Sequence, residues 1–463
     1  MKEKLIYGRD GSRMFGNPIS IVFPKDVDEV KNAIINSEDV VPRGMASNIV
    51  GACIPNDSVV IDMKKMNKVI FDFKSKIAIV EPGVTVRELN EKLKLVGYQF
   101  PILEEGTIGG LIAMNSSGVM GKYGCIKDWV REIEFVNGKG EIVKIGKADL
   151  NDVIGMEGIT GIITKAKLEL IPLMERSISI FQTENIDEIF NIAKRLRLER
   201  DIIMLRLYSP YTSKLLSFPE KYHIIIGFNS NRGKIKGEEY KQLLNKIIKD
   251  KYYLSYNGYY NSEDPQFFFD KLKDFVSSLN QLKVPYFGDL NLGIIQAFFK
   301  DDIIRGEVVK IINRMNGKPG KYGFGLKRKN LLDSLQRKII LRIKLRHDPL
   351  NKLNRGKVIN LDKEILLNKK TGDGYEEKES IDEINQIKEI NKFKEVKKVN
   401  KEFGEVNKSN IEKIEEDLEM SREMSRESID NNLNRTVKRK ISTEDMDLIN
   451  KIMLNKFKKE EDK

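Results

Sequence analysis

A glycine-rich run, Pro101–Gly124 (PILEEGTIGGLIAMNSSGVMGKYG), is the stretch of the chain best suited to holding a ligand. Small, amide and hydroxyl side chains separate its glycines, and it carries little charge although 32% of the whole chain is charged. Glycine adopts positive φ without a Cβ penalty and lets backbone approach a bulky ligand closely. The run therefore predicts either a ligand-binding loop or a tight structural hairpin.

A second loop, Pro42–Asn48, follows a short strand and combines Arg43 and Gly44 with Ser47 and Asn48. Successive backbone N–H groups in such a loop form a concave anion site, to which hydroxyl and amide side chains add donors. This chemistry fits a pyrophosphate. The loop is not a Walker loop, because no Gly-Lys-Ser/Thr follows it, and it is not a GxGxxG turn.

Short apolar patterns with strand and helix periods alternate around these loops. Lys25–Ser37 predicts a helix, and Asn137–Gly140 predicts a hairpin between two strands. Residues 176–330 alternate strand-like and helical runs, which favours a sheet with helices on one face. From about Asp362 the chain is rich in Lys, Glu and Asn. Its apolar residues recur every third position and sweep around a helix, which predicts a disordered or transiently helical tail and no stable coiled coil.

Composition excludes several classes of protein. Two cysteines and two histidines are too few for a disulfide framework, a cysteine-ligated zinc site or an iron–sulfur cluster, and leave little for histidine-based chemistry. No apolar run reaches membrane-spanning length, and the opening residues lack the apolar core of a signal peptide. The net charge of +12 comes without a basic–aromatic platform, so we expect no nucleic-acid binding. We expect a cytoplasmic protein, either free or peripheral at the inner face of the membrane.

An ordered set of motifs points to a family. They are Pro42-Arg43-Gly44, Pro82-Gly83-Val84, Thr107-Ile108-Gly109-Gly110, Asn115-Ser116-Ser117-Gly118, Lys122-Tyr123-Gly124 and Gly155–Thr164. Together they resemble the FAD domain of the vanillyl-alcohol oxidase / p-cresol methylhydroxylase superfamily. Within it the chain most resembles the D-lactate dehydrogenase and glycolate oxidase flavoproteins, over roughly residues 5–360.

The resemblance implies an α+β fold in three parts. Residues 1–175 would form a two-part FAD-binding domain, residues 176–360 an α/β cap domain, and residues 361–463 a charged tail. Non-covalent FAD is implied, because neither loop holds a histidine. The first loop would hold the pyrophosphate, Thr107–Gly124 would line the isoalloxazine and ribityl side, and Glu157–Gly161 would lie near the adenine. The implied cofactor-binding residues are Pro42, Arg43, Gly44, Met45, Ala46, Ser47, Asn48, Gly51, Thr107, Ile108, Gly109, Gly110, Asn115, Ser116, Ser117, Gly118, Gly121, Tyr123, Gly124, Glu157, Gly158, Gly161, Ile163 and Asn354.

The cap half departs from the family at its histidine motifs. The segments Tyr286–Gly293 and Gly320–Gly325 keep glycines of those motifs but none of their histidines, so we expect no metal. Tyr286 and Tyr322 are candidate catalytic groups, with Lys327 as a cationic neighbour that would lower a phenol's pKa from about 10. The alternative is that these tyrosines only fill the space of lost histidines.

Three functions remain open. The first is an FAD-dependent oxidoreductase that dehydrogenates a small anionic 2-hydroxy acid, of the D-lactate or glycolate type, by hydride transfer to flavin N5. Its partners would be the small-molecule substrate and either an electron-acceptor protein or a quinone. The second is an FAD-binding subunit with a degenerate dehydrogenase site, acting in electron transfer or assembly. The third is an α/β binding module without a flavin.

Overall fold

The computed structural model describes residues 2–361 of the chain. Contacts group these residues into one compact unit. The fold mixes helices and sheets as predicted, whereas the predicted tail lies outside the described residues except for its first residue, Leu361. The domain boundary at residue 175 stays a prediction. No helix of the described part is long and apolar enough to cross a membrane.

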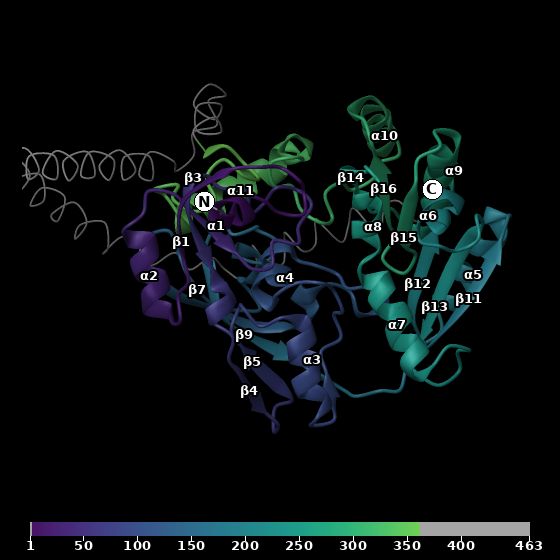
Figure 1. Cartoon of the computed structure of the whole chain (residues 1–463), viewed down its shortest axis with the longest axis horizontal. Helices are drawn as coiled ribbons and strands as arrows, with labels where there is room; N and C mark the ends of the chain where they lie inside the picture. Colours follow the sequence, from purple (N-terminus) through teal and green to yellow (C-terminus); the bar gives the residue numbers. More distant parts are fainter. Residues whose placement is uncertain (1, 362–463) are drawn as a thin grey trace, which may run out of the picture. The chain divides into compact units, whose positions relative to one another are not determined.

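The first half of the described chain contains two main sheets (Figure 1). A parallel three-stranded sheet has the order β1-β3-β2, and an antiparallel five-stranded sheet has the order β4-β5-β9-β7-β8. The strands are β1 (Asn17–Val22), β2 (Val40–Arg43), β3 (Asn56–Asp62), β4 (Val69–Asp72), β5 (Ile77–Val80), β6 (Tyr98–Gln99), β7 (Val130–Val136), β8 (Ile142–Gly146), β9 (Ile162–Glu169) and β10 (Ile171–Pro172). The predicted hairpin at Asn137–Gly140 is confirmed, because β7 pairs with β8 across it.

Helices of this half lie where the sequence supplies caps and an apolar face. They are α1 (Lys2–Tyr7), α2 (Val27–Ile35), α3 (Val86–Lys94) and α4 (Ile108–Met114). Thr85 begins α3 with a capping box, which satisfies backbone N–H groups that the helix itself leaves unpaired. Thr107 begins α4 by accepting a hydrogen bond from the N–H of Gly110, and Asn115 ends it in the left-handed region.

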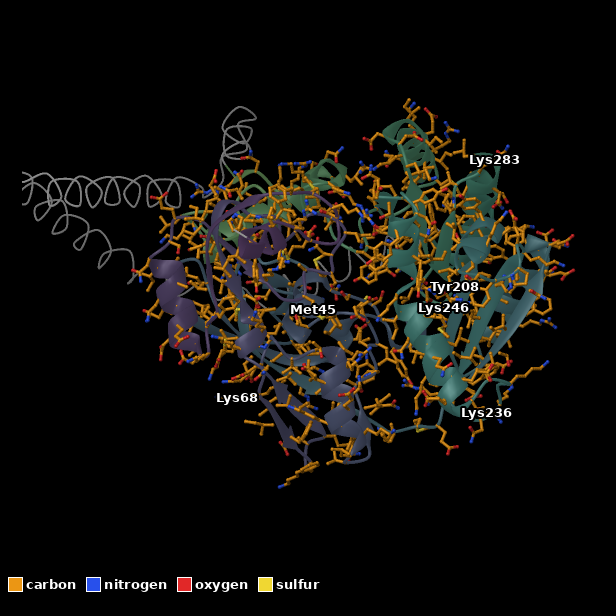
Figure 2. The ribbon with its side chains drawn as sticks, in the orientation of Figure 1. Met45, Lys68, Tyr208, Lys236, Lys246 and Lys283 are labelled. Atoms are coloured by element: carbon orange, nitrogen blue, oxygen red, sulfur yellow. The ribbon has the colours of Figure 1, made fainter. Side chains whose placement is uncertain are left out.

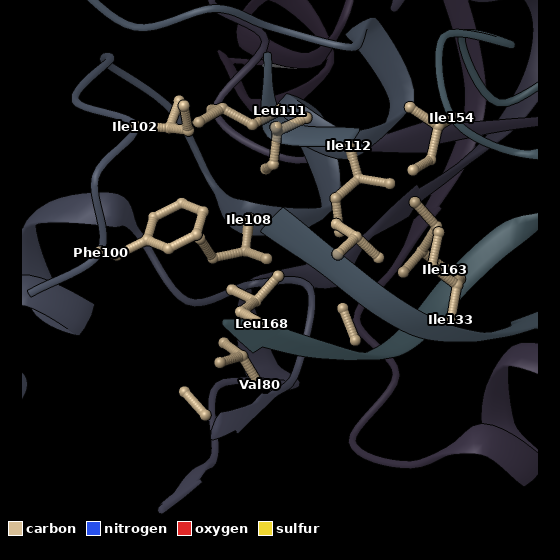
Figure 3. Packing of buried hydrophobic residues seen from close by; sticks show 14 of the residues in the cluster. Val80, Phe100, Ile102, Ile108, Leu111, Ile112, Ile133, Ile154, Ile163 and Leu168 are labelled. Atoms are coloured by element: carbon tan, nitrogen blue, oxygen red, sulfur yellow. The ribbon is translucent and has the colours of Figure 1, made fainter. Parts of the chain in front are cut away.

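The glycine-rich run is therefore not a hairpin, because it folds into α4 and the short turns that follow. The apolar side of α4, with Ile108, Leu111 and Ile112, packs into the core of the five-stranded sheet (Figure 3). Ile163 and Leu168 of β9 belong to the same cluster. This packing fixes the apolar side of α4 against the sheet and leaves Thr107, Gly109 and Gly110 of the run free of the core.

The second half of the described chain is built on one antiparallel six-stranded sheet with the order β11-β13-β12-β15-β16-β14. Its strands are β11 (Ser177–Thr183), β12 (Ile202–Tyr208), β13 (Tyr222–Phe228), β14 (Asn261–Glu263), β15 (Tyr286–Asp289) and β16 (Ile294–Phe299). Its helices are α5 (Ile186–Leu196), α6 (Pro210–Leu215), α7 (Gly237–Ile248), α8 (Asp250–Tyr256), α9 (Phe269–Gln281) and α10 (Asp302–Arg314).

Helices pack on both faces of this sheet, which corrects the prediction that they cover one face. Side chains of α5, α9 and α10 join one apolar cluster with Leu205, Leu207 and Tyr286 of the strands. Side chains of α6, α7 and α8 join a second cluster that contains Tyr208 and Phe287. Neighbouring residues of a strand point to opposite faces, so Tyr286 and Phe287 belong to different layers.

The chain then returns to the first half through α11 (Ser334–His347), drawn in green beside the purple N-terminal part in Figure 1. His347 Nε2 lies 2.9 Å from a carboxylate oxygen of Asp152. Leu353 forms a parallel bridge with Val40 of β2. Residues far apart in the sequence thus complete the region around the first loop.

A substitution of Phe135 tests the packing of α11 against the first half of the chain. Phe135 is fully buried, its ring lies 5.3 Å from that of His347, and a Cβ on Gly161 would lie 2.2 Å from it. Phe135→Ala should lower the free energy of unfolding by about 3–5 kcal/mol, because it removes a large core side chain and leaves a cavity. Phe73→Ala, at a side chain that is 57% exposed, should change it by less than about 0.5 kcal/mol. Urea unfolding followed by circular dichroism measures both, and equal effects would contradict the packing described.

Candidate functional site

A cavity with about 1350 Å³ of empty space, including its opening, lies between the first loop, α4 and the six-stranded sheet. Most of the predicted cofactor-binding residues line it. They are Pro42, Arg43, Gly44, Met45, Ala46, Ser47, Asn48, Thr107, Gly109, Gly110, Ser116, Ser117, Gly118, Glu157, Gly158, Gly161 and Ile163. The structure therefore brings three separate glycine-bearing segments to one cavity.

The first loop presents a row of free backbone donors. Within residues 2–361, the backbone N–H groups of residues 45–48 make no hydrogen bond. Ala46 adopts a φ of 51°, and the Ser47 hydroxyl donates to the carbonyl of Glu105 at 3.2 Å. Successive unpaired N–H groups in such a turn bind anions. The loop has the chemistry of a pyrophosphate site, supplied by its backbone.

The Arg43 side chain points away from this row of donors. Its guanidinium donates to the carbonyls of Tyr7 and Arg9, at 3.3 and 2.8 Å, and stacks on the Tyr7 ring. Arg43 therefore fixes the N-terminal segment, and its contribution to the cavity comes from its backbone. Met45, on the same loop, is labelled in Figure 2.

In the other two segments that line the cavity, residues 107–118 and 157–163, neighbouring atoms come so close to glycines that a side chain would not fit. A Cβ on Gly118 would lie 2.4 Å from the backbone nitrogen of Leu103, and a Cβ on Gly158 would lie 2.6 Å from the Pro42 ring. Ser117 is 2% exposed, and its hydroxyl lies beside the Tyr322 phenol, whose pKa it lowers against the larger effect of burial. The second segment therefore meets Tyr322 at the cavity.

Glu157 joins three parts of the chain. Its carboxylate accepts hydrogen bonds from the N–H groups of Phe324 and Gly325, at 2.6 and 2.9 Å. Its carbonyl accepts from the Asn354 side chain, which also donates to the carbonyl of Ala52. Burial raises the pKa of Glu157 to about 7, against the opposing effect of the two N–H donors. Glu157 thus holds the loop that carries Tyr322 at the cavity.

The remaining predicted cofactor residues lie outside the cavity lining, and their contact with a cofactor stays a prediction. They are Gly51, Ile108, Asn115, Gly121, Tyr123, Gly124 and Asn354. Ile108 faces the core and Asn354 holds Glu157. Gly121 lies under the Asp289 carboxylate, where a Cβ would approach to 2.2 Å, and Tyr123 packs edge-to-face on Trp129.

The structure separates the three predicted catalytic residues. Tyr322 lines the cavity, and burial raises its pKa above the ordinary value, so its phenol stays protonated at neutral pH. Tyr286 lies outside the lining, fully buried in the layer of α5, α9 and α10, where its hydroxyl donates to Asn280 at 3.0 Å. Lys327 also lies outside the lining, and its ammonium donates to the carbonyl of Tyr260 and to Asn261. A catalytic role for either residue stays a prediction.

Three further residues line the cavity that no sequence motif singled out. They come from the three adjacent strands β12, β15 and β16 and are Arg206, Phe287 and Gln296. The guanidinium of Arg206 lies 4.3 Å from the centre of the Phe287 ring, and Phe287 pairs directly with Gln296 in the sheet. Each of the two polar residues stands alone in an apolar strand, IIMLRLY or IIQAFF. That isolation is the signal that could have identified them.

Two ion pairs also border the cavity. Arg206 Nε donates to the Asp250 carboxylate at 2.7 Å, and the Tyr208 hydroxyl, labelled in Figure 2, donates to the same carboxylate. Lys251 pairs with Glu104 at 2.8 Å. The described part of the chain contains no group of three or more His, Cys, Asp or Glu side chains arranged to hold a metal ion.

Comparison with known proteins finds similarity in the first half of the chain. Residues 18–146 match the model of the FAD binding domain. Glycolate oxidase subunit GlcD of Bacillus subtilis is 31% identical over 206 residues, 40% of this chain and 44% of that protein. D-lactate dehydrogenase of Anaerostipes hadrus is 31% identical over 40% of this chain and 42% of its own length. D-2-hydroxyglutarate dehydrogenase of Stutzerimonas stutzeri is 29% identical over 35% of this chain and 40% of its own length. The chain spans less than half the length of these relatives.

Glu157 predicts a specific pH dependence of stability. Its pKa of about 7 in the folded chain lies above its ordinary 4.5, so the folded state binds the proton more tightly than the unfolded state. The stabilisation is complete below pH ~4.5 and is lost as the pH rises through about 7. Glu157→Gln cannot titrate at this position. Relative to that variant, the free energy of unfolding of the natural chain should fall by up to roughly 3 kcal/mol across this pH range.

Urea midpoints of the natural chain and of Glu157→Gln at a series of pH values measure this difference. If the natural chain instead became more stable than the variant as the pH rises, the account would be contradicted. That result would mean that the two N–H donors outweigh burial in setting the pKa of Glu157.

Proposed function

We propose, from the premise that the chain belongs to the vanillyl-alcohol oxidase / p-cresol methylhydroxylase superfamily of FAD-binding proteins, that it dehydrogenates a small anionic 2-hydroxy acid. One observation carries the proposal. A cavity has the free N–H groups of residues 45–48 on one side and the polar residues Arg206, Gln296 and Tyr322 on the other. The first side suits the pyrophosphate of FAD, and the second suits a small polar substrate.

The donors present fit FAD. The N–H groups of residues 45–48 would hold the pyrophosphate, while residues 107–118 and 157–163 would line the rest of the cofactor. FAD, when bound, supplies the hydride acceptor for oxidation of a CH–OH group. Cys53 also lines the cavity, and burial raises its pKa to about 12, so its thiol stays protonated and is a poor nucleophile. With no histidine in the loops, this supports non-covalent binding of FAD.

Tyr322 would bind and orient the substrate hydroxyl. Its raised pKa keeps the phenol protonated, which makes it a hydrogen-bond donor and not a general base, so the hydroxyl proton would leave to water at the opening of the cavity. Arg206 would attract the carboxylate of the substrate, and Phe287 would exclude water beside it. We propose an electron-acceptor protein or a quinone as the partner that takes up the electrons.

A second function is favoured by the position of the other two catalytic candidates. Tyr286 and Lys327 both lie outside the cavity lining, and the family's histidines are absent from the cap segments. A chain that binds FAD without dehydrogenating a substrate itself would serve as an electron-transfer or assembly subunit. Such a chain would take up FAD but would show no reduction by hydroxy acids.

Anaerobic bleaching of the bound flavin by D-lactate and glycolate distinguishes the two functions. Tyr322→Phe should slow reduction about 10-fold or more, because it removes a hydrogen bond to the reacting hydroxyl. Tyr286→Phe is the matched control, and it should leave the reduction rate unchanged because that hydroxyl contacts Asn280 in the core. No bleaching by any hydroxy acid would reject the dehydrogenase, and equal slowing by both variants would reject the role of Tyr322.

A further inference from the structure

We infer that Arg206 and Gln296 form a two-donor site for a single carboxylate, so that the chain accepts 2-hydroxy monocarboxylates and discriminates against dicarboxylates. The inference rests on the proposed function and specifies its substrate. The relatives above include proteins named for D-lactate and for D-2-hydroxyglutarate, a monocarboxylate and a dicarboxylate. Sequence similarity alone therefore does not choose between the two classes.

The two donors lie on strands β12 and β16, which flank β15 in the sheet. Phe287 of β15 pairs with Gln296 of β16 on one side and with Tyr208 of β12 on the other. The Arg206 guanidinium stacks on the same Phe287 ring. Arg206 and Gln296 therefore flank one apolar ring that also lines the cavity. An apolar floor between two N–H donors suits a small carboxylate whose charge is held at its edges.

Arg206 has one edge of its guanidinium left for a ligand. Nε and Nη2 donate to Asp250, and Nε also donates to the Tyr208 hydroxyl. Within the described residues Nη1 has no hydrogen-bond partner. Asp250 and Tyr208 are positioning residues, because they fix the orientation of the guanidinium. Asp250 also neutralises part of the charge of the Arg206 guanidinium. The charge that remains is enough for one carboxylate of a ligand and not for two.

Gln296 supplies the second donor. Its side chain is 3% exposed and lines the cavity, yet its amide nitrogen has no partner among the described residues. Leaving a buried amide unpaired is unfavourable, whereas an apolar side chain of similar size would avoid that cost. A ligand oxygen that accepts a hydrogen bond from this amide nitrogen would remove the cost of burying it, and this explains a glutamine at position 296.

The other cations that line the cavity are already occupied. Lys251 pairs with Glu104, and both side chains are largely buried. The Arg43 guanidinium donates to carbonyls of the N-terminal segment. In the described part of the lining, no further cation is left for a second carboxylate. A dicarboxylate would therefore bury a charge without a partner, which is strongly unfavourable.

Gln296→Leu tests the second donor without disturbing the fold. Because the lost amide has no protein partner, the FAD content and melting temperature should be unchanged or raised. The KM for D-lactate and the dissociation constant of pyruvate, titrated onto the oxidised holoprotein by flavin difference absorbance, should both rise roughly 10- to 100-fold. Gln182→Leu is the matched control, an exposed glutamine of the same sheet outside the lining, and both constants should stay unchanged.

Glu104→Gln tests the charge argument, because it releases Lys251 from its partner. The natural holoprotein should bind pyruvate at least about 10-fold more tightly than 2-oxoglutarate, and the variant should narrow that ratio about 10-fold. Unchanged pyruvate binding in Gln296→Leu, or tighter binding of 2-oxoglutarate than of pyruvate by the natural chain, overturns the inference. The binding titrations do not need turnover. Failure of every hydroxy acid to bleach the flavin would reject the proposed function separately.

Discussion

The buried carboxylate of Glu157 is the interaction on which the rest of the site depends. Glu157 adopts a left-handed backbone conformation, with a φ of 51°, in the turn that precedes β9. Its side chain holds the backbone of Phe324 and Gly325, and its carbonyl is held by Asn354. One residue therefore links the β9 segment, the loop of Tyr322 and the returning C-terminal segment. Together with the N–H groups of Leu326 and Lys327, which donate to the carbonyl of Val50, this link holds the loop of Tyr322 at the cavity.

Pairing of charges determines which groups at the cavity remain available. Arg206 and Lys251 each meet a carboxylate of their own, and the Arg43 side chain is used by the N-terminal segment. What remains consists of backbone N–H groups on one side and one guanidinium edge, one amide and one phenol on the other. Neutral donors, and a guanidinium whose charge is already paired with Asp250, would bind a cofactor pyrophosphate and a small carboxylate without burying an unpaired protein charge.

Sequence reasoning identified most of the loop residues that line the cavity beside α4, because glycine and small polar residues at loops reflect local backbone needs. The segment Pro42–Asn48 is an example, since its free N–H groups follow from its own turn. The substrate side depends on long-range pairing that no local pattern encodes. Tyr286 and Phe287 are adjacent in the chain, and the strand pleat alone decides which of them faces the cavity. The role of Lys327 could not be inferred either, since its partners come from Tyr260 and Asn261.

Hydrogen–deuterium exchange of the full chain with and without FAD tests most directly the claim that this cavity is the cofactor site. FAD should protect the amides of residues 45–48 most strongly, because their N–H groups are free without it, and should also protect residues 107–118 and 157–163. The strands far from the cavity, such as β4 and β11, should be unaffected. Protection that is absent from residues 45–48 and concentrated elsewhere would contradict the account.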